Sequence, residues 1–362
     1  MRRTYSILTL GASYGSLLAT KLVLAGHAVR MVCLPAEAEL FNKEGAIVRL
    51  PVKGSDELVQ IDSKAFPGKL SAAGPGEVDP GSFDLVALAM QEPQYRSPGV
   101  RELLDAVGRA RVPCVSIMNM PPLPYLRRIP GLDVDALRSA YTDATVWDNV
   151  DPAFITLCSP DPQAFRPPQE GVNVLQVRLA TNFKAARFVS DEHTAMLRQL
   201  EADIEAIRFR TASGALIELP VKLKVHDSVF VPLAKWSMLI AGNYRCVEEG
   251  GMRSIRDAVH SDLAMSRSIY EMVGAVCMSL GAAERDLVPF EKYAQAALSL
   301  KSPSSAARAL ASGARDIERV DRLVQLVARQ QGFASAEIDE TVRLVDGWLR
   351  ANRERTAETG RG

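Results

Sequence analysis

The chain has 362 residues, a mass of 39.4 kDa and equal charge of both signs, with 43 Lys+Arg against 43 Asp+Glu. Hydrophobic residues make up 47% and charged residues 24%, as in ordinary globular proteins. These values exclude a mostly disordered chain, a collagen-like chain and a coiled coil. The zero net charge argues against nucleic acid or a membrane surface as a partner. At this length two domains are expected.

Targeting and compartment signals are weak. No stretch reaches about 18 uninterrupted apolar residues, so we expect no transmembrane helix. The basic start Arg2-Arg3 could open a signal peptide, but the short run that follows ends in Gly11-Ala12-Ser13 and fits a first strand and turn better. The five cysteines form no Cys-x-x-Cys pair, which indicates buried thiols in a reducing, cytoplasmic compartment. The four histidines show no ligand spacing, so we expect no metal site.

The first half of the chain alternates short apolar runs with helical patterns. Buried strands separated by helices indicate an α/β fold with a parallel sheet covered on both faces. Right-handed crossovers then make it a doubly wound, Rossmann-type sheet. We expect strands at 6–10, 28–33, 84–89 and 114–118, and helices at 15–25, 37–43 and 100–109.

The middle of the chain is rich in proline between residues 121 and 168, which favours loops and edge strands. A further strand is expected at 172–180, with Leu175, Val177 and Leu179 on one face. The segment 193–207 has helical spacing.

From about residue 229 long helical patterns dominate, which indicates a separate all-helical domain. Helices are expected at 229–244, 254–280, 290–300, 316–331 and 336–350. We therefore expect a dinucleotide-binding Rossmann-like domain at 1–220, a helical substrate and catalytic domain at 221–350, and a polar, flexible tail at 351–362.

The first strand ends in the turn Gly11-Ala12-Ser13-Tyr14-Gly15-Ser16. Such a turn lets backbone N–H groups meet a pyrophosphate at the start of the first helix, and the hydroxyls of Ser13 and Ser16 could bind phosphate oxygens. The spacing is GxxxG and not GxGxxG, so a tight turn without a ligand stays an alternative.

Cofactor choice is usually set at the end of the second strand, where an acid binds the ribose 2′-OH and an arginine accommodates a 2′-phosphate. Here that position is Leu34, which does neither. Arg30 and Lys43 are candidate phosphate partners and Glu37 is a candidate ribose partner. The residues themselves leave NADH and NADPH open.

Lys235 lies inside an apolar helical pattern, between Val229 and Ile240. Burial should lower the pKa of such an amine, which suits a proton donor near neutral pH. Asn243 follows eight residues later, about 80° around an ideal helix, and can share a broad face with Lys235. A lysine that extends to the surface is the alternative.

The chain resembles the ketopantoate reductase family. Its opening is similar at residues 11–19 and 25–29, with one residue missing from the glycine loop, and Ile117-Met118-Asn119-Met120 resembles the segment that carries the family's active-site asparagine. The resemblance implies cofactor binding by Gly11, Ala12, Ser13, Tyr14, Gly15, Ser16, Gln91 and Asn119, catalysis by Lys235 and Asp316, and substrate binding by Asn119, Asn243 and Ser304.

Three positions depart from the family pattern. Leu239 stands where a first substrate-binding asparagine is expected, Gln91 replaces a lysine near the cofactor, and Leu34 replaces the arginine after the second strand. The loss of one polar anchor indicates a substrate other than ketopantoate, with a more apolar side chain. The region 140–220 is also longer than is usual in the family.

These observations predict an NAD(P)-dependent oxidoreductase that reduces a small 2-oxo acid or related carbonyl compound. The resemblance favours NADP(H) and leaves NAD(H) open. The nicotinamide would lie between the two domains, and Lys235 would give the developing alkoxide a proton and positive charge. Asp316 would hold Lys235 or a substrate hydroxyl.

Two other classes stay open, and a small molecule is the expected partner in each. An opine- or imine-forming dehydrogenase would use a histidine paired with an acid, for which His226-Asp227 is the candidate. A non-catalytic nucleotide-binding protein would explain the altered glycine loop. The apolar faces of the C-terminal helices are consistent with a homodimer.

Overall fold

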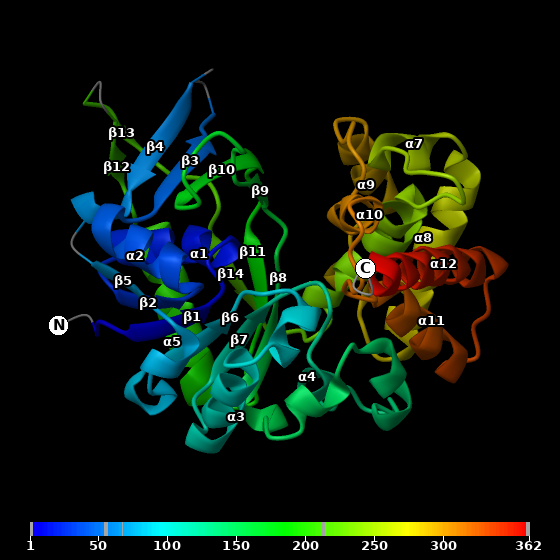
Figure 1. The fold of residues 1–362 in the computed structure, drawn as a ribbon, viewed down its shortest axis with the longest axis horizontal. Coiled ribbons are helices and arrows are strands. Elements are labelled where there is room, and N and C mark those ends of the chain that lie inside the picture. Colours follow the sequence, from blue (N-terminus) through cyan, green and yellow to red (C-terminus); the bar gives the residue numbers. More distant parts are fainter. Residues whose placement is uncertain (1–2, 54–56, 67, 212–213, 360–362) are drawn as a thin grey trace. The chain divides into compact units, whose positions relative to one another are not determined.

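The computed structural model describes residues 3–53, 57–66, 68–211 and 214–359 (Figure 1). The chain forms two compact units. The first comprises Met1–Met90, Gln94–Tyr125 and Thr145–Pro232, and the second comprises Gln91–Pro93, Leu126–Ala144 and Leu233–Gly362.

The first unit is built on a sheet in which the described residues form eight strands, in the order β14-β11-β8-β7-β6-β1-β2-β5 (Figure 1). From β5 to β8 neighbouring strands are parallel, whereas β8 and β11 are antiparallel. The order reverses between β1 and β6, as in a doubly wound nucleotide-binding sheet, so the expected α/β class is confirmed. The strands are β1 (Ser6–Leu10), β2 (Ala28–Val32), β5 (Lys69–Ala73), β6 (Leu85–Leu88), β7 (Cys114–Ile117), β8 (Ile155–Ser159), β11 (Phe183–Ala186) and β14 (Leu223–His226).

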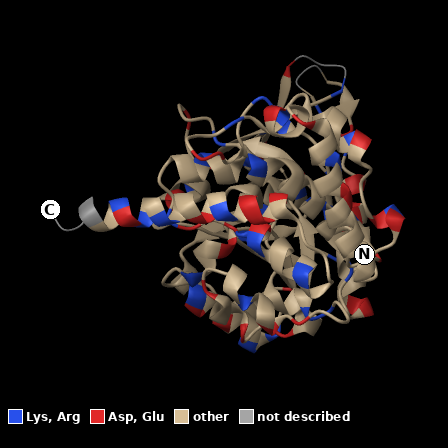
Figure 2. Cartoon of the chain, turned by 90° about the vertical axis from the view of Figure 1, so that its right-hand side faces the viewer, with Lys and Arg blue, Asp and Glu red and all other residues tan. Residues whose placement is uncertain are grey.

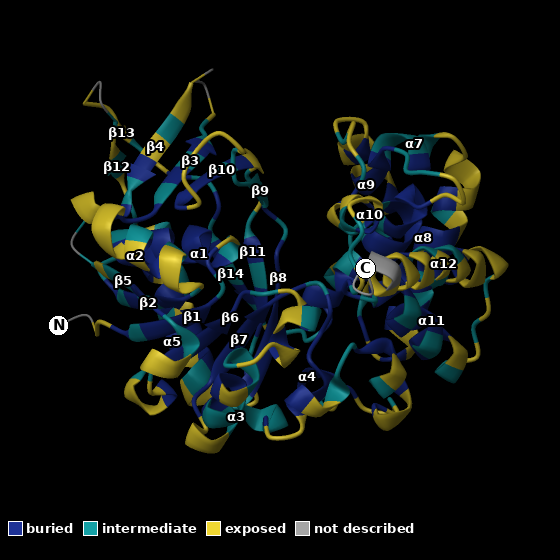
Figure 3. Cartoon of the chain, viewed as in Figure 1, coloured by how far each residue is buried: buried dark blue, intermediate teal, exposed yellow. Residues whose placement is uncertain are grey.

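The central strands are buried on both faces, because β6, β7 and β8 are buried at every position (Figure 3). The helices of this unit are α1 (Tyr14–Leu24), α2 (Pro35–Glu44), α3 (Val100–Ala110) and α5 (Asp191–Glu205), and α4 (Leu123–Leu126) follows the turn after β7. The expectation of loops and edge strands between residues 121 and 168 is wrong for β8. Its five residues form an uninterrupted buried run inside the sheet, and the prolines flank this run without entering it.

A second sheet in the first unit has four described strands in the order β4-β3-β10-β9. They are β3 (Ile47–Pro51), β4 (Leu58–Asp62), β9 (Gln163–Phe165) and β10 (Val174–Leu179). In β10, Leu175 and Val177 are buried as expected but Leu179 is exposed. The pairing of β10 with β9 shifts between Val177 and Leu179, and such an irregularity redirects the side chains that follow it. The short strands β12 (Phe209–Arg210) and β13 (Leu216–Ile217) form a hairpin.

The second unit is helical, as expected, and no strand is assigned to it within the described residues. Its helices are α6 (Lys235–Met238), α7 (Ile255–His260), α8 (Leu263–Ser279), α9 (Phe290–Ala297), α10 (Ser305–Ala311), α11 (Val320–Gln330) and α12 (Ala336–Thr359). The single helix expected at 254–280 is divided in two. The first helix, α7, ends at His260. Asp262 then caps the start of α8, since its side chain accepts the N–H of Met265.

The division between the units differs from the expected boundary at residue 220. The strand β14 pairs in parallel with β11, so the first unit continues to Pro232. The segment 126–144, expected in the first domain, belongs to the second unit. The expected flexible tail also differs, since α12 runs to Thr359 and the amide of buried Asn352 donates to the carbonyl oxygens of Leu310 and Ala314.

Charged side chains of both signs are interspersed, for example along α12 (Figure 2). Among the helices that the structure describes, none combines the length and apolar character that crossing a bilayer requires.

Candidate functional site

The turn after β1 depends on two glycines. Gly11 has a φ of +101°, and a Cβ atom there would lie 2.6 Å from Cγ of Met90 and 2.7 Å from the carbonyl oxygen of Ala89. A Cβ atom on Gly15 would lie 2.7 Å from Cγ2 of Thr9, so α1 starts in close contact with β1. The GxxxG spacing thus retains two of the tasks of a dinucleotide-binding glycine loop, the tight turn and the close packing of helix on strand.

The first turn of α1 fits an anion. Ser13 precedes the helix without a side-chain cap, and the first turn contains no acidic residue. Ser13 is exposed, so its hydroxyl and the N–H groups beside it can meet a phosphate. Ser16 is buried and its Oγ donates to the carbonyl oxygen of Ser13 at 2.8 Å, which favours a structural task for that hydroxyl. Ala12 is buried and Tyr14 is half-buried.

Two further predicted cofactor residues follow central strands. Asn119 is half-buried and comes two residues after the end of β7, at the carboxyl edge where ligands of such sheets bind. Gln91 is exposed and follows β6, but it belongs to the second unit and not to the Rossmann unit in which it was expected.

Lys235 is the first residue of α6 and is half-buried. The same helix continues into a π-helical turn, Leu239–Asn243, in which the N–H of Tyr244 donates to the carbonyl oxygen of Leu239. A π turn accommodates one extra residue, so the eight-residue spacing from Lys235 to Asn243 behaves like seven residues of α-helix. The two side chains then differ by about 20° and share one face more closely than an ideal α-helix allows.

Ser304 is buried and both ends of its hydroxyl are engaged. The Oγ atom accepts the N–H of Ala307 at 3.2 Å, which caps α10, and donates to the carbonyl oxygen of Asn243 at 2.7 Å. The structure therefore brings Ser304 to the end of the π turn. Because its hydroxyl is engaged in this way, Ser304 is better suited to position Asn243 than to contact the substrate directly, as was predicted.

Asp316 is half-buried, and its Oδ1 accepts a 2.9 Å hydrogen bond from Nη2 of Arg353 on α12. The segment that carries it is attached to the lysine helix through Tyr244, whose hydroxyl donates to the carbonyl oxygen of Glu318 and accepts the N–H of Val320. Lys235, Asn243, Ser304 and Asp316 thus all lie in the second unit, whereas the glycine turn and Asn119 lie in the first.

No protein-family model matches the chain, and no curated protein matches it. Among solved structures, 2-dehydropantoate 2-reductase from Methylococcus capsulatus aligns over 96% of this chain and 97% of its own, with a TM-score of 0.63 and 14% identity. The chain has the fold of the ketopantoate reductases. A dimeric ketopantoate reductase from Staphylococcus aureus aligns over 96% and 99%, with a TM-score of 0.57 and 10% identity. A D-sorbitol dehydrogenase aligns over 96% and 81%, with a TM-score of 0.51 and 12% identity.

The family resemblance in the sequence is thus confirmed at the level of the fold. The ketopantoate reductase fold spans nearly the whole chain, with a Rossmann unit followed by a helical unit. Identities this low leave the chemistry to be argued from the residues present.

Sequence reasoning missed a pair of buried carboxylates in the second unit. Glu92 is 2% exposed, and its carboxylate accepts the N–H and the hydroxyl of Thr142 at 3.0 and 2.9 Å. Burial, aided by the negative charge of Glu318, raises the pKa of Glu92 to about 7, although the bonds from Thr142 lower it. Glu92 stands next to Gln91 in the sequence, but nothing there pairs it with residues 50 and 226 positions away.

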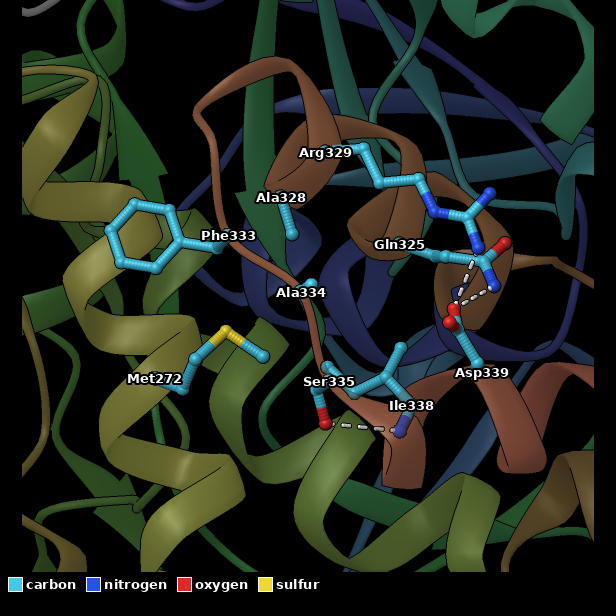
Figure 4. Close-up of a pocket in the computed structure, with 9 residues that line it drawn as sticks. All are labelled: Met272, Gln325, Ala328, Arg329, Phe333, Ala334, Ser335, Ile338 and Asp339. Carbon is cyan, nitrogen blue, oxygen red and sulfur yellow. Dashed lines mark hydrogen bonds and ion pairs between the residues drawn. The ribbon is translucent and has the colours of Figure 1, made fainter.

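A small, open pocket between α8, α11 and the start of α12 has a cavity volume of about 10 Å³, roughly room for one water molecule. It is lined by Met272, Gln325, Ala328, Arg329, Phe333, Ala334, Ser335, Ile338 and Asp339 (Figure 4). Its polar groups bond to one another, since Gln325 and Arg329 both donate to Oδ1 of Asp339. Ligand sites usually enclose about 300–1,000 Å³, so this pocket is too small for a dinucleotide. The described residues contain no cluster of His, Cys, Asp and Glu that could hold a metal ion.

Proposed function

We propose that the protein is an NAD(P)H-dependent reductase of a small 2-oxo acid or a related carbonyl compound. The observation that carries this proposal is the shared face of Lys235 and Asn243 on a π-turned helix, in a chain with the ketopantoate reductase fold. Turns of this kind are frequent at functional sites, because they re-aim side chains at the expense of regular hydrogen bonding.

The first unit would bind the dinucleotide. The two close-packed glycines and the uncapped start of α1 fit a pyrophosphate, and Asn119 lies at the edge where the nicotinamide half is expected. When bound, the cofactor supplies the hydride. Every other part of the chemistry falls to the residues of this chain.

The helical unit would supply the proton. Nζ of Lys235 donates a proton to the oxygen of the substrate carbonyl and stabilises the negative charge that develops on it. The amides of Asn243 and Asn119 orient the substrate. Ser304 holds the carbonyl of Asn243 and so positions that residue, while Asp316 holds a substrate hydroxyl or the lysine.

The substrate would be less polar than ketopantoate. Leu239, one helical turn after Lys235, is buried and offers no hydrogen bond where the family pattern has an asparagine. We therefore propose a 2-oxo acid without a hydroxyl group at that point of its side chain. A site that lacks the polar partner gains little from a polar substrate.

The opine alternative is less well supported. In the candidate pair His226-Asp227, the carboxylate of Asp227 is exposed and accepts a hydrogen bond from Nη2 of Arg198 at 2.6 Å. A 2-oxo acid assayed with and without an amino acid separates the two reactions, since an opine-forming enzyme consumes both.

The test is the oxidation of NADPH and NADH over a panel of 2-oxo acids. Lys235→Ala should lower kcat by about 10²-fold or more while the affinity for cofactor stays within about twofold. Lys301→Ala, an exposed lysine of the same unit, is the matched control and should behave like the wild type. An unchanged kcat in Lys235→Ala would contradict the mechanism. Cofactor binding without turnover of any substrate would favour the non-catalytic alternative.

We also propose a cytoplasmic homodimer. All five cysteines are free thiols, as is usual in a reducing compartment. The ketopantoate reductase from Staphylococcus aureus is dimeric. Sedimentation of the purified protein tests the dimer.

A further inference from the structure

The carboxyl end of β2 is the place where a Rossmann unit distinguishes NADPH from NADH. Here β2 ends at Val32 and is followed by Cys33, Leu34 and Pro35, none of which carries a charge. Leu34 is 70% exposed, so this end of the strand presents an apolar surface on which the adenosine half of a dinucleotide can lie. The charge that selects the cofactor has to come from another part of the chain.

Arg30 and Lys43, the phosphate partners expected from the sequence, do not place a charge at the end of β2. Arg30 lies inside the strand, in register with Leu8 and Ser71 of the neighbouring strands, and not at its end. Lys43 is near the last turn of α2, eight residues from its start, which is about 12 Å along the helix axis.

The second sheet brings a different arginine to this place. Arg166 follows β9, which pairs with β10, and β10 pairs with β3 directly after α2. Nη1 of Arg166 donates to Oε1 of Glu37 at 2.6 Å, and Glu37 lies in the first turn of α2. The side chains of Arg166 and Glu37 are 28% and 18% exposed, so both are held in place and still within reach of a ligand.

The Cys33 thiol, directly after β2, lies within electrostatic range of both members of this pair. Burial and the charge of Glu37 raise the pKa of the Cys33 thiol to about 11, and the charge of Arg166 acts in the opposite direction. Both charges therefore act directly on the first residue after the strand.

We propose that Arg166 recognises the 2′-phosphate of NADPH and sets the preference of the protein for NADPH over NADH. This inference rests on the proposed function only in that a nicotinamide dinucleotide must bind. A guanidinium has five N–H donors, and Arg166 uses one of its nitrogens for Glu37 within the described residues. Its remaining donors can take phosphate oxygens, while Glu37 fixes the orientation of the guanidinium.

The segment between residues 140 and 220 thereby contributes to the cofactor site. It carries β9 and β10, and so brings Arg166, which is 132 positions after Leu34, to the start of α2. The opposite assignment is that Glu37 accepts the ribose 2′-OH and the protein prefers NADH. The same experiment decides between the two.

The experiment is a fluorescence titration of the full-length protein with NADPH and with NADH. In Arg166→Ala the affinity for NADPH should fall about 10- to 100-fold, the usual value of hydrogen bonds to a charged group, while the affinity for NADH changes less than about twofold. Arg166→Lys should lie in between, because it keeps the charge and loses the planar fork. Arg49→Ala is the matched control, because Arg49 lies on β3 of the same four-stranded sheet and its loss also breaks an ion pair, the bidentate one with Glu170. This variant should leave both affinities unchanged.

Three outcomes would overturn the proposal. They are an equal loss of both affinities in Arg166→Ala, an unchanged affinity for NADPH, and a loss of NADH affinity in Glu37→Gln that exceeds the loss for NADPH. Thermal unfolding of each variant identifies one that has lost its fold, in which case Arg166→Lys decides. If the wild type binds neither dinucleotide, the proposed function itself fails, which is a distinct result.

Discussion

The hydroxyl of Ser304 donates a 2.7 Å hydrogen bond to the carbonyl oxygen of Asn243, 61 positions earlier in the chain. Asn243 is the last residue of the π turn, and the same hydroxyl caps α10. One side chain therefore fixes both the end of the lysine helix and the start of another helix. This connection makes the placement of Asn243 a property of the whole helical unit.

Replacement of Ser304 should affect both stability and substrate binding. Ser304→Ala removes a helix cap and a buried hydrogen bond, which should lower the free energy of unfolding by about 1–2 kcal/mol. If Ser304 positions Asn243, KM should rise more than kcat falls. Urea unfolding and steady-state kinetics measure the two effects. Ser305→Ala, at the exposed neighbouring position, is the control. A loss of kcat at unchanged KM would contradict the positioning role.

The glycine turn offers a second prediction. In Gly15→Ala the new Cβ atom must displace Thr9 from a distance of 2.7 Å, which moves the start of α1 away from β1. We expect the affinity for NADPH to fall by about tenfold or more, because the N–H groups of α1 lose their position. Gly26→Ala is the contrasting variant: its Cβ atom meets no described atom within 4 Å, although its φ of +95° imposes strain. Titration with NADPH should show a loss for Gly15→Ala alone.

The sequence allowed the parallel core to be predicted because its strands are short, uninterrupted apolar runs next to their helices. The predicted strand at 6–10 coincides with β1, and the helix at 100–109 differs from α3 by one residue. The four-stranded sheet was missed apart from β10, since β3 and β10 pair across more than 120 positions and the pairing has no local signal.

The candidate site divides in the same way. The glycine turn, Lys235 and Asn243 are recognisable from local patterns, and their assigned roles stay predictions. Glu92 and Arg166 could not be identified because their environments come from distant segments. The π turn was also invisible, since an apolar helical pattern gives no sign of one extra residue.

The buried carboxylate of Glu92 should make stability depend on pH. Its folded-state pKa, about 7, lies above the ordinary value of 4.5. Because folding raises this pKa, the carboxyl group contributes most to the free energy of unfolding below pH 4.5, where it is protonated in both states. This contribution is lost as the pH rises through about 7. Thr142, Tyr141 and Glu318 face this carboxylate. Glu92→Gln should remove the dependence, which is on the order of 3 kcal/mol at most. Urea unfolding at pH 5 to 8 measures it, with Glu354→Gln as an exposed control. A slope that persists in Glu92→Gln would rule out this carboxylate as its source.

The buried amine of Lys21 should produce a dependence of the opposite sign in the first unit. Lys21 lies in α1, is 1% exposed, and donates to the carbonyl oxygen of Pro220. Burial, with a smaller contribution from Lys222, lowers its pKa from 10.5 to about 7. The unfolded chain therefore binds this proton more tightly than the folded one, and the free energy of unfolding should rise between about pH 7 and 10.5 with a slope of up to about 1.4 kcal/mol per pH unit.

Lys21→Met isolates this contribution, because it keeps an unbranched side chain of similar length and removes the charge. The slope between pH 7 and 10 should then flatten, and stability at pH 7 should rise if the release of a buried charge outweighs the lost bond to Pro220. Lys69→Met, at an exposed position on β5, should leave the slope unchanged. Equilibrium unfolding in urea at four or five pH values measures all three proteins. If Lys21→Met keeps the wild-type slope, the amine of Lys21 stays charged in the folded protein. Another titrating group then causes the pH dependence of stability.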